Sequence, residues 1–169
     1  MGIRVHHLMN MTRRNFVATL GALFVSLRGA SAASPQDPGK IDKVRLSDED
    51  WRKRLAPEQY AVLRHESTER PGSSPLNGEH RKGTFVCAGC DLALFTSEAK
   101  FESGTGWPSF FTFIPGRLET KTDFKLVLPR TEYHCARCEG HQGHVFDDGP
   151  KPTGKRYCNN GVALKFVPA

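Results

Sequence analysis

The sequence lacks an apolar run long enough to cross a membrane, and it carries little net charge beyond its first 32 residues. Its apolar stretch from Phe16 to Leu27 falls well short of the about 20 residues that a membrane-spanning helix requires. Four of the 24 basic side chains and none of the 18 acidic ones lie within residues 1–32, which leaves 20 basic and 18 acidic side chains in residues 33–169. This near-neutral balance argues against a nucleic-acid partner.

The basic N-terminal segment has the order of features found in export signals. The pair Arg13-Arg14 precedes the apolar run, and the small residues around Ala32 provide a cleavage site. The arginine pair followed by Phe16 resembles the twin-arginine signal of bacteria. An ordinary secretory signal or an uncleaved anchor is the alternative interpretation.

These features divide the chain into three parts. We predict a signal peptide of the twin-arginine type over residues 1–32, with either Met1 or Met11 as its start, then a linker over 33–45 and one domain over 46–169. The predicted location of the mature protein is the periplasm, without stable insertion in a membrane.

The sequence has five cysteines, and their spacing is informative. Four of the five cysteines form two C-x-x-C pairs, Cys87 with Cys90 and Cys135 with Cys138. This spacing predicts one tetrahedral zinc ion, Zn²⁺, and because four thiolates leave no open coordination position, the ion is expected to be structural. Two disulfides are the alternative in an oxidising compartment. Cys158 remains outside both pairs.

The neighbours of Cys158 favour a chemical role for its thiol over that of a small buried hydrophobe. Arg156 lies two residues away and favours the thiolate, which is the nucleophilic form. His141 and His144 are three residues apart among glycines, so we expect them on a loop or tight hairpin, and histidine transfers protons readily near neutral pH. Further metal ligation or surface exposure is the alternative for these histidines.

The pattern of the remaining sequence predicts a mainly β fold, with antiparallel sheets after short N-terminal helices. We expect helices to begin near Ser47 and Pro57. From Gly83 onward, short apolar runs separated by Gly, Pro, Asp and Asn predict strands. These runs are Thr84–Val86, Ala93–Phe95, Lys125–Leu128 and Val162–Val167.

Several segments together resemble one enzyme family. They are Pro57–Tyr60, Thr68–Pro71, both C-x-x-C pairs, Ser103–Phe110, Gly143–Pro150 and Arg156–Asn160. In this order they are similar to the B-type methionine-R-sulfoxide reductases (MsrB), from about Asp48 to Pro168. The resemblance implies two antiparallel sheets with short N-terminal helices (the MsrB or Mss4-like β-tent) and a structural zinc. A zinc-ribbon-like binding module without catalysis is the alternative.

The resemblance implies roles for the residues around the thiol. Cys158 attacks the sulfur of the sulfoxide and becomes a sulfenic acid as methionine leaves. Substrate binding falls to Trp107, which holds the S-methyl group, to Phe146, which shapes the pocket, and to Arg156, which supports the thiolate.

The resemblance also implies which residues help the oxygen to leave and which partners the protein has. His141 and His144 bond to or protonate the departing oxygen, and Asn160 orients the site. The expected partners are methionine-R-sulfoxide, protein-bound or free, and a thioredoxin-like or other thiol reductant. We expect the protein to act as a monomer.

Three positions depart from many members of the family. Thr105 stands where many members have a resolving cysteine, so we expect an external thiol to reduce the sulfenic acid directly. Asn159 and Gly161 replace an apolar and a small or hydroxyl residue, and we expect them to tune the pocket without altering the reaction.

Overall fold

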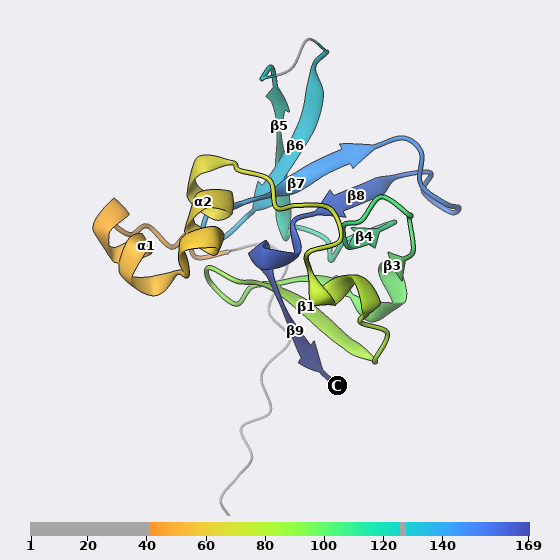
Figure 1. Cartoon of the computed structure of the whole chain (residues 1–169), viewed down its shortest axis with the longest axis horizontal. Coiled ribbons are helices and arrows are strands. Elements are labelled where there is room, and N and C mark those ends of the chain that lie inside the picture. Colours follow the sequence, from red (N-terminus) through yellow and green to blue (C-terminus); the bar gives the residue numbers. More distant parts are fainter. Residues whose placement is uncertain (1–40, 126–127) are drawn as a thin grey trace, which may run out of the picture. The chain divides into compact units, whose positions relative to one another are not determined.

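Two short helices precede the sheets, as the sequence predicts (Figure 1). The computed structural model describes residues 41–125 and 128–169, so the predicted signal peptide and residues 33–40 of the predicted linker lie outside it. Helix α1 (Asp48–Arg54) begins after Ser47, whose Oγ accepts a hydrogen bond from the backbone N–H of Asp50 at 3.1 Å. Helix α2 (Pro57–His65) begins with a proline, whose missing N–H has no helical partner to lose in the first turn.

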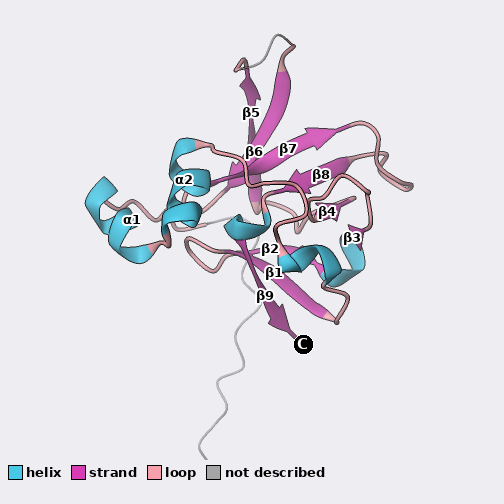
Figure 2. Cartoon of the chain, in the orientation of Figure 1, coloured by secondary structure: helices cyan, strands magenta, loops and turns pink. Residues whose placement is uncertain are grey.

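The strands of the described residues form two antiparallel sheets, which confirms the predicted fold class (Figure 2). The smaller sheet has the order β2 (Ala93–Thr96), β1 (Gly83–Cys87), β9 (Leu164–Pro168). The larger has the order β3 (Lys100–Phe101), β4 (Ser109–Phe110), β8 (Arg156–Asn159), β7 (His141–Phe146), β6 (Arg130–Cys135), β5 (Leu118–Asp123). Short 3-10 helices cover Pro75–Gly78, Ser97–Ala99 and Gly161–Ala163.

One predicted strand is wrong, and the strand predicted over Val162–Val167 begins only at Leu164, because a 3-10 helix covers Gly161–Ala163. Lys125 and Leu128 of the run predicted over 125–128 lie in the connection between β5 and β6, and residues 126 and 127 lie outside the described part. Strand β5 ends before this apolar run. Its last register pair with β6 is Asp123 opposite Arg130, and an ion pair of 2.6 Å joins these two side chains. The register between β5 and β6 and the ion pair at its last residues therefore mark the end of the strand pairing, whereas the apolar run does not.

The hydrophobic core joins aromatic side chains from both sheets. Phe85 and Phe95 of the smaller sheet and Phe110 and Tyr133 of the larger one are fully buried. The rings of Phe95 and Phe110 stack with centroids 4.0 Å apart, and Phe85 meets Phe110 edge-on at 5.0 Å. Because β4 also pairs with β8, this stack supports the strand that carries Cys158.

The last residues of the predicted linker already contact the domain. Ile41 and Val44 pack against the core, and the backbone N–H of Val44 donates to the carbonyl of Arg137 at 2.8 Å. Lys43 forms an ion pair with Glu119 at 2.8 Å. Within the described residues, no helix has the length and apolar character that a membrane span requires.

Candidate active site and metal centre

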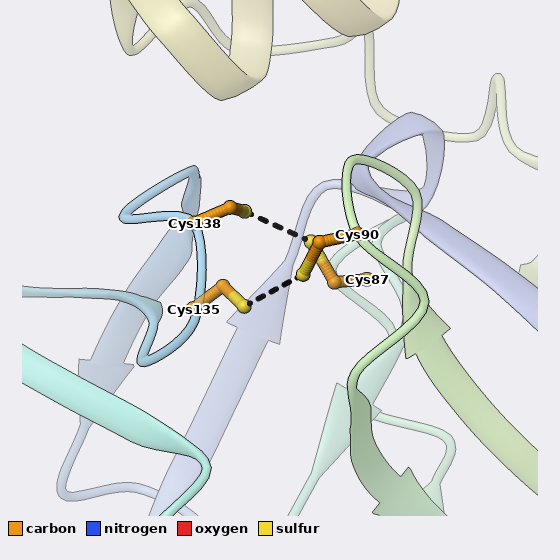
Figure 3. A group of neighbouring side chains, drawn as sticks. All are labelled: Cys87, Cys90, Cys135 and Cys138. Carbon is orange, nitrogen blue, oxygen red and sulfur yellow. Dashed lines mark hydrogen bonds between the residues drawn. The ribbon is translucent and has the colours of Figure 1, made fainter. Parts of the chain in front are cut away.

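The four paired cysteines converge on one point from two turns (Figure 3). Their Sγ atoms all lie within 4.8 Å of one another, with Cys87 to Cys138 at 3.6 Å and Cys90 to Cys135 at 3.5 Å. A tetrahedral ion with Zn–S bonds of about 2.3 Å separates its sulfur ligands by about 3.8 Å. All four side chains are buried and all five cysteines of the chain are free, so the disulfide alternative is not realised. The four cysteines fit one structural zinc site.

Each pair begins at the last residue of a strand and continues into a turn of the same form. The carbonyl of Cys87, the last residue of β1, accepts from the N–H of Asp91 at 2.9 Å, and Asp91 has a φ of 59°. The carbonyl of Cys135, the last residue of β6, accepts from the N–H of Glu139 at 2.9 Å, and that residue also has a φ of 59°. Two matching turns therefore present two thiolates each from segments that are distant in the sequence.

Gln142 connects the metal centre to the strand of the fifth cysteine. Its Nε2 donates to Cys87 Sγ at 3.4 Å, and its Oε1 accepts from Nδ2 of Asn159, also at 3.4 Å. Its carbonyl accepts from the backbone N–H of Asn160 at 2.8 Å and from Nδ2 of the same residue at 3.0 Å. Gln142 is fully buried, and no sequence motif indicates a role for it. The site around Cys158 is thus bound to the metal centre through one side chain.

Cys158 lies in the middle of the larger sheet and is the only one of the five cysteines that is not buried. Its register partners are Ser109 on β4 and His144 on β7, and His144 in turn lies opposite Glu132 on β6. Directly opposed residues of antiparallel strands project their side chains from the same face. The fold therefore brings a thiol, an imidazole and a carboxylate into one row.

The two histidines lie on strand β7, so the predicted loop or tight hairpin is wrong. Residues three apart on a regular strand face opposite sides of the sheet. Here Gly143 pairs with Tyr133 and His141 pairs with His134, so β7 has one extra residue, a bulge at this point. The bulge restores a common face, and the rings of His141 and His144 meet edge-on with centroids 5.5 Å apart.

His144 is held by an acidic side chain at the end of β5. Its Nε2 lies 2.7 Å from Oδ2 of Asp123, which also pairs with Arg130. Burial lowers the pKa of His144, and the hydrogen bond to Asp123 opposes that shift. The pKa of Asp123 lies well below its usual range, chiefly because the backbone N–H of Lys125 donates to its carboxylate.

His141 lies behind His144 and is almost fully buried. Its Nδ1 is 2.8 Å from Oε1 of Glu132, whose other oxygen pairs with Lys121 at 2.9 Å. Burial acts to raise the pKa of Glu132, but the hydrogen bonds from His141 and Lys121 together outweigh it and lower that pKa. Nε2 of His141 is buried without a hydrogen-bond partner in the protein. Glu132 thus fixes the ring and leaves its second nitrogen available.

A pocket of about 150 Å³ opens over the thiol. Its lining residues are Thr68, Trp107, Arg130, Gly143, His144, Phe146, Cys158, Asn159 and Asn160. The structure therefore brings together five of the seven predicted catalytic and substrate-binding residues. His141 and Arg156 are not among the lining residues, although both adjoin them. Asn159 contributes to the lining, whereas Gly161 does not.

The indole of Trp107 is hydrogen-bonded to the loop of Thr68 and Glu69, and Thr68 also lines the pocket. Its Nε1 donates to the carbonyl of Glu69 at 3.2 Å, while the backbone N–H of Glu69 donates to Oδ1 of Asn160 at 3.1 Å. The Glu69 carboxylate accepts from the N–H groups of Gly161 and Val162 at 2.5 and 3.0 Å. Burial raises the pKa of Glu69. These bonds fix the indole relative to the strand of Cys158.

Hydrogen bonds to Asp148 and a cation–π contact with Phe146 hold Arg156 near the thiol. It donates two hydrogen bonds to Asp148, at 2.7 and 2.8 Å, and its guanidinium carbon lies 4.4 Å from the ring centroid of Phe146. Burial raises the pKa of Cys158, and the charge of Arg156, together with hydrogen bonds from Thr105 and Arg156, opposes that rise. Arg156 therefore acts on the charge of the sulfur from outside the pocket lining.

Arg156→Met is expected to raise the pKa of Cys158 further, because burial then acts with less opposition. A thiol reacts as its thiolate, so the rate of alkylation by iodoacetamide should shift to higher pH and fall about tenfold at pH 7 for a shift of about one unit. Peptide mass mapping gives the rate for Cys158 alone. Lys155→Met, which removes an adjacent exposed cation, is the control and should leave the pH profile unchanged. An unchanged profile in Arg156→Met would contradict this account.

The two sheets, the four-thiolate centre and the accessible thiol beside paired histidines define a protein with a structural metal and a separate thiol site. A family model, the SelR domain, matches residues 55–168, so the chain belongs to that family. Proteins named peptide methionine sulfoxide reductase MsrB are similar to it. The one from Bradyrhizobium diazoefficiens is 54% identical over 75% of this chain and 92% of its own length. The one from Methanosarcina barkeri is 53% identical over 73% and 87%.

A plant relative is similar over more of the chain. It is the peptide methionine sulfoxide reductase B1, chloroplastic, of Arabidopsis thaliana, which is 45% identical over 86% of this chain and 75% of its own length. The family and these relatives do not favour the zinc-ribbon-like binding module.

Proposed function

We propose that this chain is a thiol-dependent reductase of methionine-R-sulfoxide that returns oxidised methionine to methionine. The observation that carries the proposal is Cys158, an accessible thiol opposite His144 in a pocket walled by Trp107, in a chain about half identical to proteins named MsrB. Its substrate is the R-sulfoxide of methionine, and its co-substrate is a thiol reductant.

In the proposed reaction the Cys158 sulfur attacks the sulfoxide sulfur, and the oxygen is transferred to the thiol. The cysteine is oxidised to a sulfenic acid by two electrons, and the sulfoxide is reduced to the thioether by the same two. Two external thiols then reduce the sulfenic acid and yield one disulfide and one water. The balance requires no electron carrier within the protein.

The pocket geometry supports a division of roles. Trp107 and Phe146 offer apolar surface for the S-methyl group, and His144 lies beside the thiol to protonate the departing oxygen. His141 supports His144 through the contact between their rings, and its Nε2 has no hydrogen-bond partner in the protein. Asn160 orients the site, because it bonds at once to Glu69 and to the carbonyl of Gln142.

The zinc stays remote from this chemistry. Its four ligands, Cys87, Cys90, Cys135 and Cys138, fill a tetrahedron, so the ion when bound supplies structural cross-linking and no open position. These thiolates are committed to the metal, which leaves no spare resolving cysteine among the five. We therefore propose direct reduction of the sulfenic acid by an external thiol, thioredoxin-like or small.

A stereochemical assay tests the proposed function. The substrate is N-acetyl-methionine sulfoxide with equal amounts of the R and S configurations at sulfur. With excess dithiothreitol the protein should consume the R isomer, half of the substrate, and leave the S isomer, as measured by chiral chromatography. Consumption of both isomers, or of neither, would overturn the proposal.

Thr105→Cys is expected to change how the sulfenic acid is resolved. The Thr105 side chain is close enough to Cys158 to lower the pKa of its thiol, so a cysteine at position 105 is expected to reach the oxidised sulfur. One turnover without reductant should then yield an intramolecular disulfide and lose two hydrogens, and thioredoxin should become the better reductant. Thr105→Ser is the matched control and should retain one oxygen on Cys158. Absence of the disulfide would show that the loop does not bring position 105 to the sulfur.

We also propose that the protein acts as a periplasmic monomer, exported by the twin-arginine route. The pair Arg13-Arg14 before the apolar run supports the export route. Cell fractionation of the protein and of Arg13→Lys/Arg14→Lys, with size-exclusion chromatography of the mature form, tests both points. An unchanged location in the double variant would count against the twin-arginine route, and a dimer would count against the monomer.

A further inference from the structure

The β5–β6 hairpin carries two exposed apolar side chains at its tip. Among the described residues four large hydrophobic side chains are exposed, and Phe124 and Leu128 are the most exposed at 74% and 75%. Leu46 and Val167 are 38% and 49% exposed. We call Phe124 and Leu128 together the hairpin tip. Figure 1 shows this hairpin extending beyond the neighbouring strands of its sheet, at the top of the view.

The hairpin tip is continuous with the candidate active site. Phe124 follows directly after Asp123, whose carboxylate holds His144, and Leu128 lies two residues before Arg130, which lines the pocket. Two residues of extended chain span at most about 7 Å. The backbone of the tip therefore lies within about 7 Å, along the chain, of Asp123 and Arg130 at the candidate active site.

Ion pairs connect the β5–β6 hairpin to the loop after α2, which contributes to the pocket lining. Glu66 forms ion pairs of 2.5 Å with both Lys121 and Lys125, and it lies two residues before Thr68 of the pocket lining. The ion pair of Asp123 with Arg130 joins the two strands just below the tip. These contacts hold the base of the tip in a defined position relative to the pocket.

We propose that the hairpin tip is a docking surface for the apolar side chains that flank an oxidised methionine in an unfolded polypeptide. The inference rests on the proposed function. A pocket of about 150 Å³ accommodates a methionine sulfoxide side chain, and the rest of a polypeptide substrate must lie outside it. An extended peptide advances about 3.3 Å per residue, so residues two to four positions from the sulfoxide reach the tip.

The apolar side chains of the hairpin tip favour an unfolded polypeptide as the bound partner. Apolar side chains gain free energy when they leave water together, and methionines that a folded protein buries are surrounded in sequence by other apolar residues. Such segments reach an external pocket only when they are unfolded. The tip thus favours oxidised, unfolded chains over free methionine sulfoxide, which has no side chains to place there.

The experiment compares three substrates in the full chain. They are N-acetyl-methionine-R-sulfoxide amide, a peptide with leucines two to four residues on each side of the R-sulfoxide, and the same peptide with serines there. For Phe124→Ser/Leu128→Ser, kcat/KM for the leucine peptide should fall about tenfold, with little change for the other two substrates. Leu46→Ser/Val167→Ser removes apolar surface elsewhere and should change none of the three values.

Each other outcome overturns the inference. An equal fall on all three substrates would place the tip in catalysis or folding, and no fall on the leucine peptide would remove its docking role. If the unsubstituted protein elutes as a dimer and the tip variant as a monomer, the tip joins two copies of the chain. If the unsubstituted protein reduces none of the substrates, the proposed function fails and this inference fails with it.

Discussion

Cys158→Ser is expected to lower kcat/KM for methionine-R-sulfoxide by at least about a thousandfold. The hydroxyl of serine is a far weaker nucleophile than a thiolate, and it cannot take up the sulfoxide oxygen as a stable sulfenic acid. Release of methionine under excess dithiothreitol, followed by chromatography, measures the loss.

The fold of this variant should be unchanged. Cys158 is partly exposed and takes no part in the four-cysteine centre, and serine is close to cysteine in size. The thermal unfolding midpoint and the zinc content are therefore the controls. A Cys158→Ser protein that kept its fold and still reduced the R-sulfoxide would show that the nucleophile is misassigned.

Loss of the metal is expected to abolish cooperative unfolding of the domain. Four buried thiolates join segments that are far apart in the sequence, and structural zinc contributes about 10–16 kcal/mol of apparent binding free energy at neutral pH. A domain of this kind has a total stability of about 5–15 kcal/mol. Cys135→Ser, or removal of the ion by a strong chelator, should therefore yield a protein without a sharp thermal transition by circular dichroism.

Activity should disappear with the metal, although the ion takes no part in the reaction. Gln142 links Cys87 to Asn159 and Asn160, so loss of the centre releases the strand that carries the thiol. Cys158→Ser serves as the opposite control, because it should keep the zinc and the thermal transition. A metal-free protein that unfolded at the same temperature with the same cooperativity would contradict the structural role.

The metal centre could be predicted from the sequence because its determinants are local. Each C-x-x-C pair occupies one turn, so the spacing alone indicates two ligands for one ion. The two helices were predicted for the same reason, since Ser47 and Pro57 signal a helix start within a few residues. The strands of the larger sheet were harder to predict. In β5, Leu118 and Asp123 are buried and the four residues between them are exposed, so no apolar alternation marks the strand.

The partners of the candidate site could not be predicted, because long-range register creates them. Asp123 meets His144, and Glu132 meets His141, across strands whose pairing no local pattern reveals. The bulge at Gln142 that turns both histidines to one face has no sequence signal either. The family resemblance supplied the identities of the residues near the sulfur, and only the structure shows which of them line the pocket.

Native mass spectrometry after one turnover tests whether Cys158 takes up the sulfoxide oxygen. The zinc-loaded protein is mixed with one equivalent of methionine-R-sulfoxide in the absence of reductant. The expected result is release of methionine, retention of one zinc and the gain of one oxygen on Cys158. Loss of two hydrogens with release of zinc would mean that a metal-site cysteine resolves the sulfenic acid, and an unchanged mass with the zinc still bound would contradict the assignment of Cys158 as the nucleophile.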